Sequence, residues 1–206
     1  MPEKRFLQAA KTTQKKRRQD LFEPKQRFLI VCEGANTEPN YFKSFPIPPD
    51  SVVDVEGPGM NTDALVRKTI ELKAKKKYDQ VWVVFDRDSF TVEHFNNALR
   101  LADDNDIQVA YSNEAFELWY YLHFHYLDTG ITRQDYCDRL SQRDCLGHKY
   151  DKGSKTIYSE ILWRQPTAIR HAEKLLDQYN PKNPVVDKPS TKVHLLVIQL
   201  NRKFWD

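Results

Sequence analysis

The chain has 206 residues, of which 40% are hydrophobic and 30% are charged, and its formal net charge is +3. This length suits one sizeable α/β domain and is too short for two full domains. No apolar run approaches the roughly 20 residues of a membrane span, and the mean hydropathy is −0.72. The basic N-terminus lacks a following apolar stretch, and three cysteines give no disulfide framework, so we expect a cytoplasmic protein without membrane association.

The N-terminal segment carries a dense run of positive charge at Lys15, Lys16, Arg17 and Arg18. Such a run could bind nucleic-acid phosphates, since each neutralised phosphate releases counterions. It could equally be a solvated leader with no partner. We therefore divide the chain into a partly disordered basic arm over residues 1–25 and one domain over residues 26–206.

After the arm, strand and helix patterns alternate along the chain. We expect strands near residues 28–33, 52–55, 80–85 and 107–111. The runs FLIVC and VWVVF are continuously apolar, which is typical of strands buried on both faces of a parallel sheet. Helices are expected near residues 37–45, from 61 onward, at 92–104, and in the C-terminal third at about 159–163, 167–179 and 191–204. Right-handed crossovers then give a three-layer, Rossmann-like α/β fold with a mostly parallel sheet and additional C-terminal helices.

Carboxylates follow two of these buried strands. Glu33 comes after FLIVC, and Asp86 and Asp88 come after VWVVF. Ligands of open α/β sheets bind outside the carboxyl ends of the strands. If the two strands are neighbours, the three acids meet, and they favour a hard divalent cation, Mg²⁺ or Mn²⁺. The alternative is that Asp86 and Asp88 cap the following helix while Glu33 pairs with Arg87 or a lysine.

A further acid lies in an unusually apolar segment. Residues 114–126 read EAFELWYYLHFHY, which predicts a buried helix. Glu117 in this segment needs a partner, because an isolated buried carboxylate is costly. It could bind a metal ion, or it could pair with Lys152 or Lys155.

Three lysines lie in the polar segment HKYDKGSKT. We expect Lys155 to act as a catalytic cation, and Lys149 and Lys152 to contact nucleic acid; the alternative is a plain solvated loop. Zinc is not favoured, because His123, His125, Cys137, Cys145 and His148 include no paired CxxC motif. Neither GxxxxGK[ST] nor GxGxxG occurs, so we expect neither ATP hydrolysis nor dinucleotide binding.

Four motifs give the chain a resemblance to a known family. They are Phe28-Leu-Ile-Val-Cys-Glu-Gly-Ala-Asn-Thr-Glu-Pro-Asn-Tyr-Phe42, Val84-Phe-Asp-Arg-Asp88, Ser112-Asn-Glu-Ala-Phe-Glu-Leu-Trp-Tyr-Tyr-Leu-His-Phe124 and Pro189-Ser-Thr-Lys-Val-His194. In these the chain resembles the RloB-like proteins of bacterial and archaeal abortive-infection systems, which have a Toprim-like core. The resemblance implies a metal site made by Glu33, Asp86 and Asp88, with Glu117 as an accessory carboxylate. It also implies a role in anti-phage defence and an ATPase partner.

The residues and the resemblance together predict a metal-dependent nuclease that hydrolyses phosphodiester bonds in RNA or DNA, with Glu33, Asp86, Asp88, Glu117 and Lys155 in the catalytic site. The chain could also form homo-oligomers. Two other functions stay open: a module that binds nucleic acid or a nucleotide signal and regulates a partner ATPase without cutting, and an enzyme acting on small phosphate esters.

Overall fold

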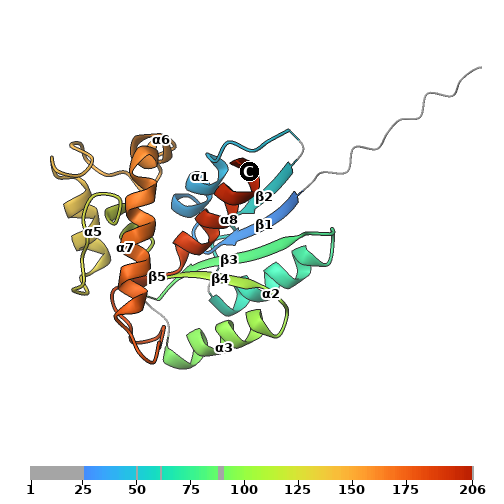
Figure 1. Cartoon of the computed structure of the whole chain (residues 1–206). Helices are drawn as coiled ribbons and strands as arrows, with labels where there is room; N and C mark the ends of the chain where they lie inside the picture. Colours follow the sequence, from blue (N-terminus) through green and yellow to red (C-terminus); the bar gives the residue numbers. More distant parts are fainter. Residues whose placement is uncertain (1–25, 50, 61, 88–90, 206) are drawn as a thin grey trace, which may run out of the picture.

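This computed structural model describes residues 26–49, 51–60, 62–87 and 91–205 (Figure 1). Its central element is a five-stranded sheet with the order β2-β1-β3-β4-β5. The strands are β1 (Gln26–Cys32), β2 (Ser51–Glu56), β3 (Gln80–Asp86), β4 (Gln108–Asn113) and β5 (Ser190–Thr191). The first four are mutually parallel, and β5 pairs antiparallel to β4. The predicted α/β class with a mostly parallel sheet is confirmed.

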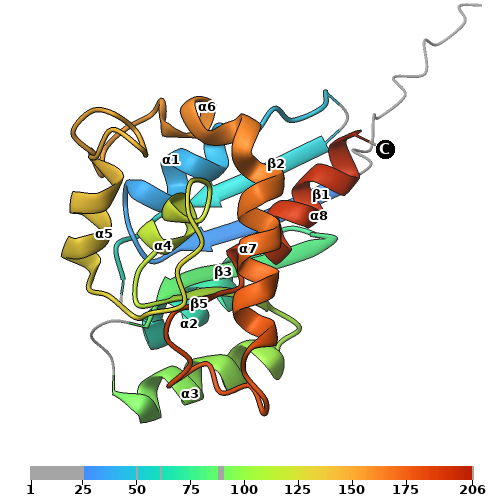
Figure 2. The same cartoon turned by 60° about the vertical axis from the view of Figure 1, so that its left-hand side comes forward.

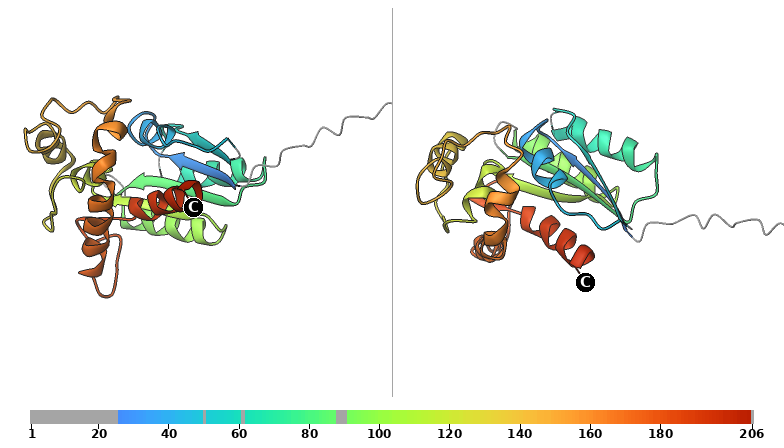
Figure 3. Two further views of the ribbon diagram at one scale, coloured as in Figure 1. Left: turned by 45° about the horizontal axis from the view of Figure 1, so that its top comes forward. Right: turned by 90° about the horizontal axis from the view of Figure 1, so that it is seen from above.

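Helices cover both faces of this sheet. They are α1 (Thr37–Lys43), α2 (Thr62–Lys73), α3 (Val92–Asp103), α4 (Glu117–Tyr121), α5 (Arg133–Leu140), α6 (Ile157–Ile161), the short 3₁₀ helix η1 (Leu162–Arg164), α7 (Gln165–Asp177) and α8 (Val193–Trp205). Figure 3 shows α2 on one side of the sheet and α8 on the other. Among the described residues, no helix has the length and apolar character needed to cross a bilayer.

Two separate apolar cores explain why β1 and β3 are continuously hydrophobic. Leu29, Val31 and Phe85 point to the face that α2 and α3 cover. Phe28 and Ile30 point to the opposite face, into a larger core shared with α1, α4, α7 and α8. Successive side chains of a strand point to opposite faces. A strand between two cores therefore needs an apolar residue at every position.

Strand pairing places β1 and β3 side by side, as the acid pattern requires. Cys32 lies opposite Val84 in the register, and the Glu33 backbone N–H donates to Val84 O at 2.8 Å. Figures 1 and 2 show α5 beyond the carboxyl ends of these strands. Glu33 after β1 and Asp86 at the end of β3 therefore lie at the same edge of the sheet, on the side where α5 lies.

Two sequence expectations were wrong, and one helix was not expected. The helix predicted over residues 114–126 is limited to α4, because the backbone tightens after Tyr121: His123 N donates to Tyr120 O and Phe124 N to Tyr121 O, an i to i−3 pattern. The C-terminal helix does not begin at Thr191, which belongs to β5. Helix α5 was not expected at all; its sequence RQDYCDRL is mostly polar, and only Tyr136 and Leu140 are buried.

Candidate functional site: an acidic pocket at the carboxyl edge of the sheet

Glu33, which directly follows β1, and Asp86, the last residue of β3, come together. Glu33 Oε2 accepts a hydrogen bond from the Asp86 backbone N–H at 2.9 Å. Asp86 itself is only 6% exposed. The parallel register fixes this contact, since both residues lie at the carboxyl ends of paired strands. The structure thus brings together two of the three acids that the sequence predicted at this edge; Asp88 lies outside the described residues.

A third carboxylate, Glu38, enters the same place from α1. Its side chain is 5% exposed. It lies so close to Gly34 that a Cβ atom at residue 34 would overlap Glu38 Oε2. A side chain at residue 34 would therefore push the Glu38 carboxylate out of its present position.

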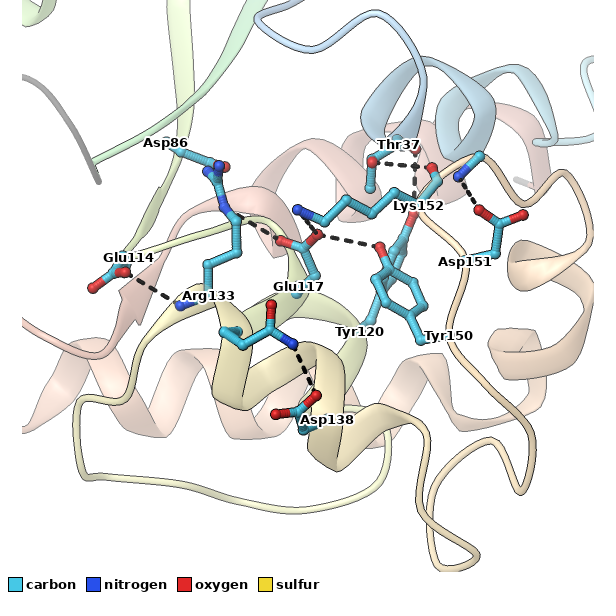
Figure 4. Close-up of polar contacts among 12 residues, drawn as sticks. Thr37, Asp86, Glu114, Glu117, Tyr120, Arg133, Asp138, Tyr150, Asp151 and Lys152 are labelled. Carbon is cyan, nitrogen blue, oxygen red and sulfur yellow. Dashed lines mark hydrogen bonds and ion pairs between the residues drawn. The ribbon is translucent and has the colours of Figure 1, made fainter.

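Glu117 reaches the pocket from the other side, at the start of α4. It is 3% exposed, and the Tyr150 hydroxyl donates to Glu117 Oε1 at 3.3 Å. Lys152 Nζ lies 3.8 Å from the same oxygen (Figure 4). One partner considered for Glu117 from the sequence, Lys152, is thus in place. The nearby Glu114 points elsewhere, forming an ion pair with Lys188 and accepting a hydrogen bond from the Arg133 backbone N–H.

Arg133, the first residue of α5, lies between two of these acids. A reciprocal capping box between Thr132 and Asp135 fixes the start of this helix. The Arg133 Nη2 atom is 2.7 Å from Asp86 Oδ2, and its Nε atom is 3.9 Å from Glu117 Oε2 (Figure 4). The guanidinium therefore partly neutralises carboxylates from two different elements.

The loop that carries Lys152 is attached to α1 by hydrogen bonds from side chains of the helix to backbone oxygens of the loop. Thr37 Oγ1 donates to Lys152 O at 3.1 Å, and Asn40 Nδ2 donates to Gly153 O at 3.1 Å. Lys152 thus lines the pocket. Lys149 and Lys155 are exposed and do not line it. The basic arm residues Lys15, Lys16, Arg17 and Arg18 lie outside the described residues.

These groups enclose a pocket of about 250 Å³, called the acidic pocket below; it is lined by Glu33, Gly34, Thr37, Glu38, Asp86, Phe116, Glu117, Arg133 and Lys152. A larger cavity of about 770 Å³ lies between α3, β4 and α8, with Trp82, Leu99 and Lys192 in its wall. None of the sequence-predicted site residues that the structure describes lines the larger cavity. We therefore assign the candidate site by chemistry and not by size.

Burial and mutual repulsion disfavour ionisation in the acidic pocket. Burial raises the pKa of Asp86 well above its usual value; the charges of Glu38, Glu117 and Glu33 add to this effect, and Arg133 opposes it. Burial also raises the pKa of Glu38, as does the charge of Glu117, whereas backbone hydrogen bonds and Arg133 offset the rise only in part. Like charges held together in a dry site have this effect, and an added cation would relieve it.

The donor set of the acidic pocket fits a hard divalent cation in kind and in charge. When ionised, its four described carboxylates face two cations, Arg133 and Lys152, which leaves a formal charge of −2. Carboxylate oxygens are the ligands that Mg²⁺ and Mn²⁺ prefer. Among the described residues, however, no three of these carboxylates have oxygens within 4.8 Å of one another. Binding of an ion by three of them would therefore require the carboxylates to move closer together.

Two pocket residues were missed in the sequence. Glu38 has the position of an acid in the first turn of a helix, which is common without any function. Arg133 lies 47 residues from Asp86 along the chain, so only the tertiary fold brings them together. The one local signal for Glu38 was its place four residues after Gly34, in the motif that follows β1.

The fold and the site define an α/β protein with a carboxylate-rich pocket at the carboxyl edge of a mostly parallel sheet. The chain belongs to the RloB-like protein family, whose model matches residues 28–200. The resemblance drawn from its four motifs is thereby confirmed. No curated protein and no solved structure matches the chain.

Proposed function

We propose that this protein is a Mg²⁺- or Mn²⁺-dependent nuclease with a Toprim-like core. The observation that carries the proposal is the acidic pocket: a half-buried Glu33 after β1 and a buried Asp86 at the end of the adjacent parallel strand β3, with further buried carboxylates and two cationic side chains beside them. Such an arrangement suits phosphodiester hydrolysis, in which negative charge must be both held and neutralised.

The carboxylates supply the ion-binding side of this function. Glu33, Asp86 and Glu117 would hold the ion, together with Asp88, and Glu38 adds a further buried carboxylate to the set. When bound, a divalent ion polarises a phosphoryl oxygen and lowers the pKa of bound water. The protein's own part is to hold these acids in fixed positions through the strand register and the tight turn at Gly34.

The two cationic side chains supply the phosphate-binding side. Arg133 carries a planar fork of donors that matches the geometry of a phosphate group. Lys152 is held over the pocket by the contacts of its backbone and that of Gly153 with α1. Lys152 is therefore better placed than Lys155 to stabilise the charge that develops on a phosphoryl group.

The biological setting of the proposal comes from the family. RNA, including transfer RNA, and DNA are both substrates that suit this chemistry. The resemblance to abortive-infection proteins supports a role in anti-phage defence and control by a partner ATPase. The basic arm would add sequence-independent affinity for nucleic acid.

Purified protein tests the proposal directly. We expect cleavage of RNA or DNA with Mn²⁺ or Mg²⁺, none with EDTA, and none for Asp86→Asn, whose folding is checked by circular dichroism. Asp138→Asn is the matched control. Asp138 lies on α5, outside the pocket, and its carboxylate accepts a hydrogen bond from Gln134 Nε2 at 2.8 Å. Full activity in Asp86→Asn would refute the assigned site. Metal-independent binding without cleavage would instead identify a binding module.

A further inference from the structure

A second group of potential metal ligands lies outside the acidic pocket, on the segments that flank α5. His125 follows α4, and Asp144 and Cys145 lie in the turns after α5. One ligand atom from each of these three residues lies within 4.8 Å of the other two. These three residues were not grouped in the sequence analysis, because Asp144 was not among the expected ligands and no CxxC pair is present. We call these three residues the His-Asp-Cys cluster.

The His125 ring lies beside Asp144 but makes no hydrogen bond with it. Its backbone N–H donates to Tyr121 O at 3.1 Å, and its ring packs against the Tyr121 ring with a centroid distance of 5.6 Å. The Nε2 atom lies 3.1 Å from Asp144 Oδ2. This contact lacks hydrogen-bond geometry, so the buried Nε2 atom has no hydrogen-bond partner among the described residues. A ring nitrogen without a hydrogen bond, beside a carboxylate and a thiol, is a group that a bound cation would satisfy.

The turn after α5 holds Cys145 in place. The Cys145 backbone N–H donates to Gln142 O at 3.1 Å, and the Gly147 N–H donates to the same oxygen at 2.9 Å. Gly147 has a φ of +74°, a conformation that glycine adopts without strain. Asp144 is 63% exposed, so an ion and its water could enter from solvent.

The donor set selects the kind of metal. Imidazole and thiolate are ligands of zinc and not of Mg²⁺, and zinc also accepts a carboxylate oxygen. An ionised carboxylate and a thiolate, which forms when the Cys145 proton leaves to solvent, together balance the charge of Zn²⁺. We propose that His125, Asp144 and Cys145 bind a zinc ion, with one coordination position left to water.

The other candidates considered for zinc in the sequence do not join this site. His123 Nδ1 is 2.9 Å from Trp119 O, and His148 Nε2 is 2.7 Å from Glu160 Oε2.

The zinc site would tie the segment after α4 to the segment after α5. The latter segment continues to Tyr150 and Lys152, both of which contact Glu117. Zinc would therefore restrain the loop that closes one side of the acidic pocket.

Cobalt is the probe for this site, because Co²⁺ takes the place of zinc and gives visible spectra. The full chain, freed of metal, is titrated with Co²⁺. We expect one equivalent to produce a thiolate-to-cobalt charge-transfer band and the strong visible absorption of a four-coordinate ion, both abolished by Zn²⁺. Loss of an outer-shell partner alone lowers metal affinity about 10- to 100-fold. Asp144→Asn, a change at an exposed side chain, should therefore lower the cobalt affinity at least about tenfold.

Three variants make the assignment specific. Cys145→Ser should abolish the charge-transfer band, whereas Cys137→Ser, at another partly buried cysteine of the same region, should leave it intact. Asp86→Asn should also leave it intact, which separates this site from the acidic pocket. Absence of the band in the wild-type chain, or a band that survives Cys145→Ser, would overturn the proposal. An affinity unchanged by Asp144→Asn would overturn the three-ligand site.

Discussion

Replacing Glu38 by glutamine should change how the stability of the metal-free protein depends on pH. Glu38 is buried, and its pKa is raised from the usual 4.5 by burial and by the charge of Glu117. A carboxyl group with a raised pKa in the folded state favours folding at low pH, and this contribution is lost as the pH rises through the folded pKa. Glutamine preserves the shape of the side chain but does not titrate. The Glu38→Gln protein should therefore lose less stability than the wild type as the pH rises.

The size of this change in stability is set by the single proton that the Glu38 carboxyl group binds in the folded chain. Where the unfolded chain has released the proton and the folded chain still holds it, the free energy of unfolding falls by up to about 1.4 kcal/mol per pH unit. For a domain of this size, 1 kcal/mol shifts the melting temperature by about 2–4 °C. The wild-type curve should thus fall more steeply than the Glu38→Gln curve by up to about 3–6 °C per pH unit above pH 4.5.

The assay is thermal unfolding followed by circular dichroism in EDTA, over a pH series that starts near 4.5. Asp138→Asn, at an exposed acid on α5, serves as the control and should give a curve parallel to that of the wild type. Parallel curves for Glu38→Gln and the wild type would show that the Glu38 carboxyl group is not perturbed by the acidic pocket, and the reasoning would fail.

Three other changes probe the proposed nuclease. Gly34→Ala should displace the Glu38 carboxylate and weaken Mn²⁺ binding at least about tenfold, measured by calorimetry; unchanged affinity would exclude Glu38 from the ion site. Lys152→Met should lower the rate of cleavage about tenfold or more at saturating substrate, whereas Lys155→Met, outside the pocket, should have a smaller effect; the reverse order would favour Lys155 as the catalytic cation. Deleting residues 1–20 should weaken nucleic-acid binding and flatten its salt dependence, and an unchanged slope would mean that the arm is a solvated leader.

The sequence predicted the parallel part of the fold well. Continuous apolar runs identify β1 and β3 because only strands covered on both faces need them. The meeting of Glu33 and Asp86 follows once those strands are adjacent, since parallel strands end at one edge. Both predictions rest on local pattern plus one topological rule.

The rest of the site could not be predicted in the same way. Arg133 comes from a mostly polar helix, and its contact with Asp86 depends on how α5 packs beyond the sheet. The apolar run around Glu117 correctly indicated burial, but apolar composition alone does not distinguish a long buried helix from a short helix followed by buried turns. Strand β5 has only two residues and carries no periodic signal of its own.

The proposed nuclease depends on a divalent cation bound in the acidic pocket. A crystal soaked in Mn²⁺ and measured for anomalous scattering tests this most directly. We expect an anomalous peak beside Glu33 and Asp86, with the Arg133 guanidinium moved away from Asp86. Density without such a peak, and with the 2.7 Å Arg133–Asp86 ion pair intact, would contradict it.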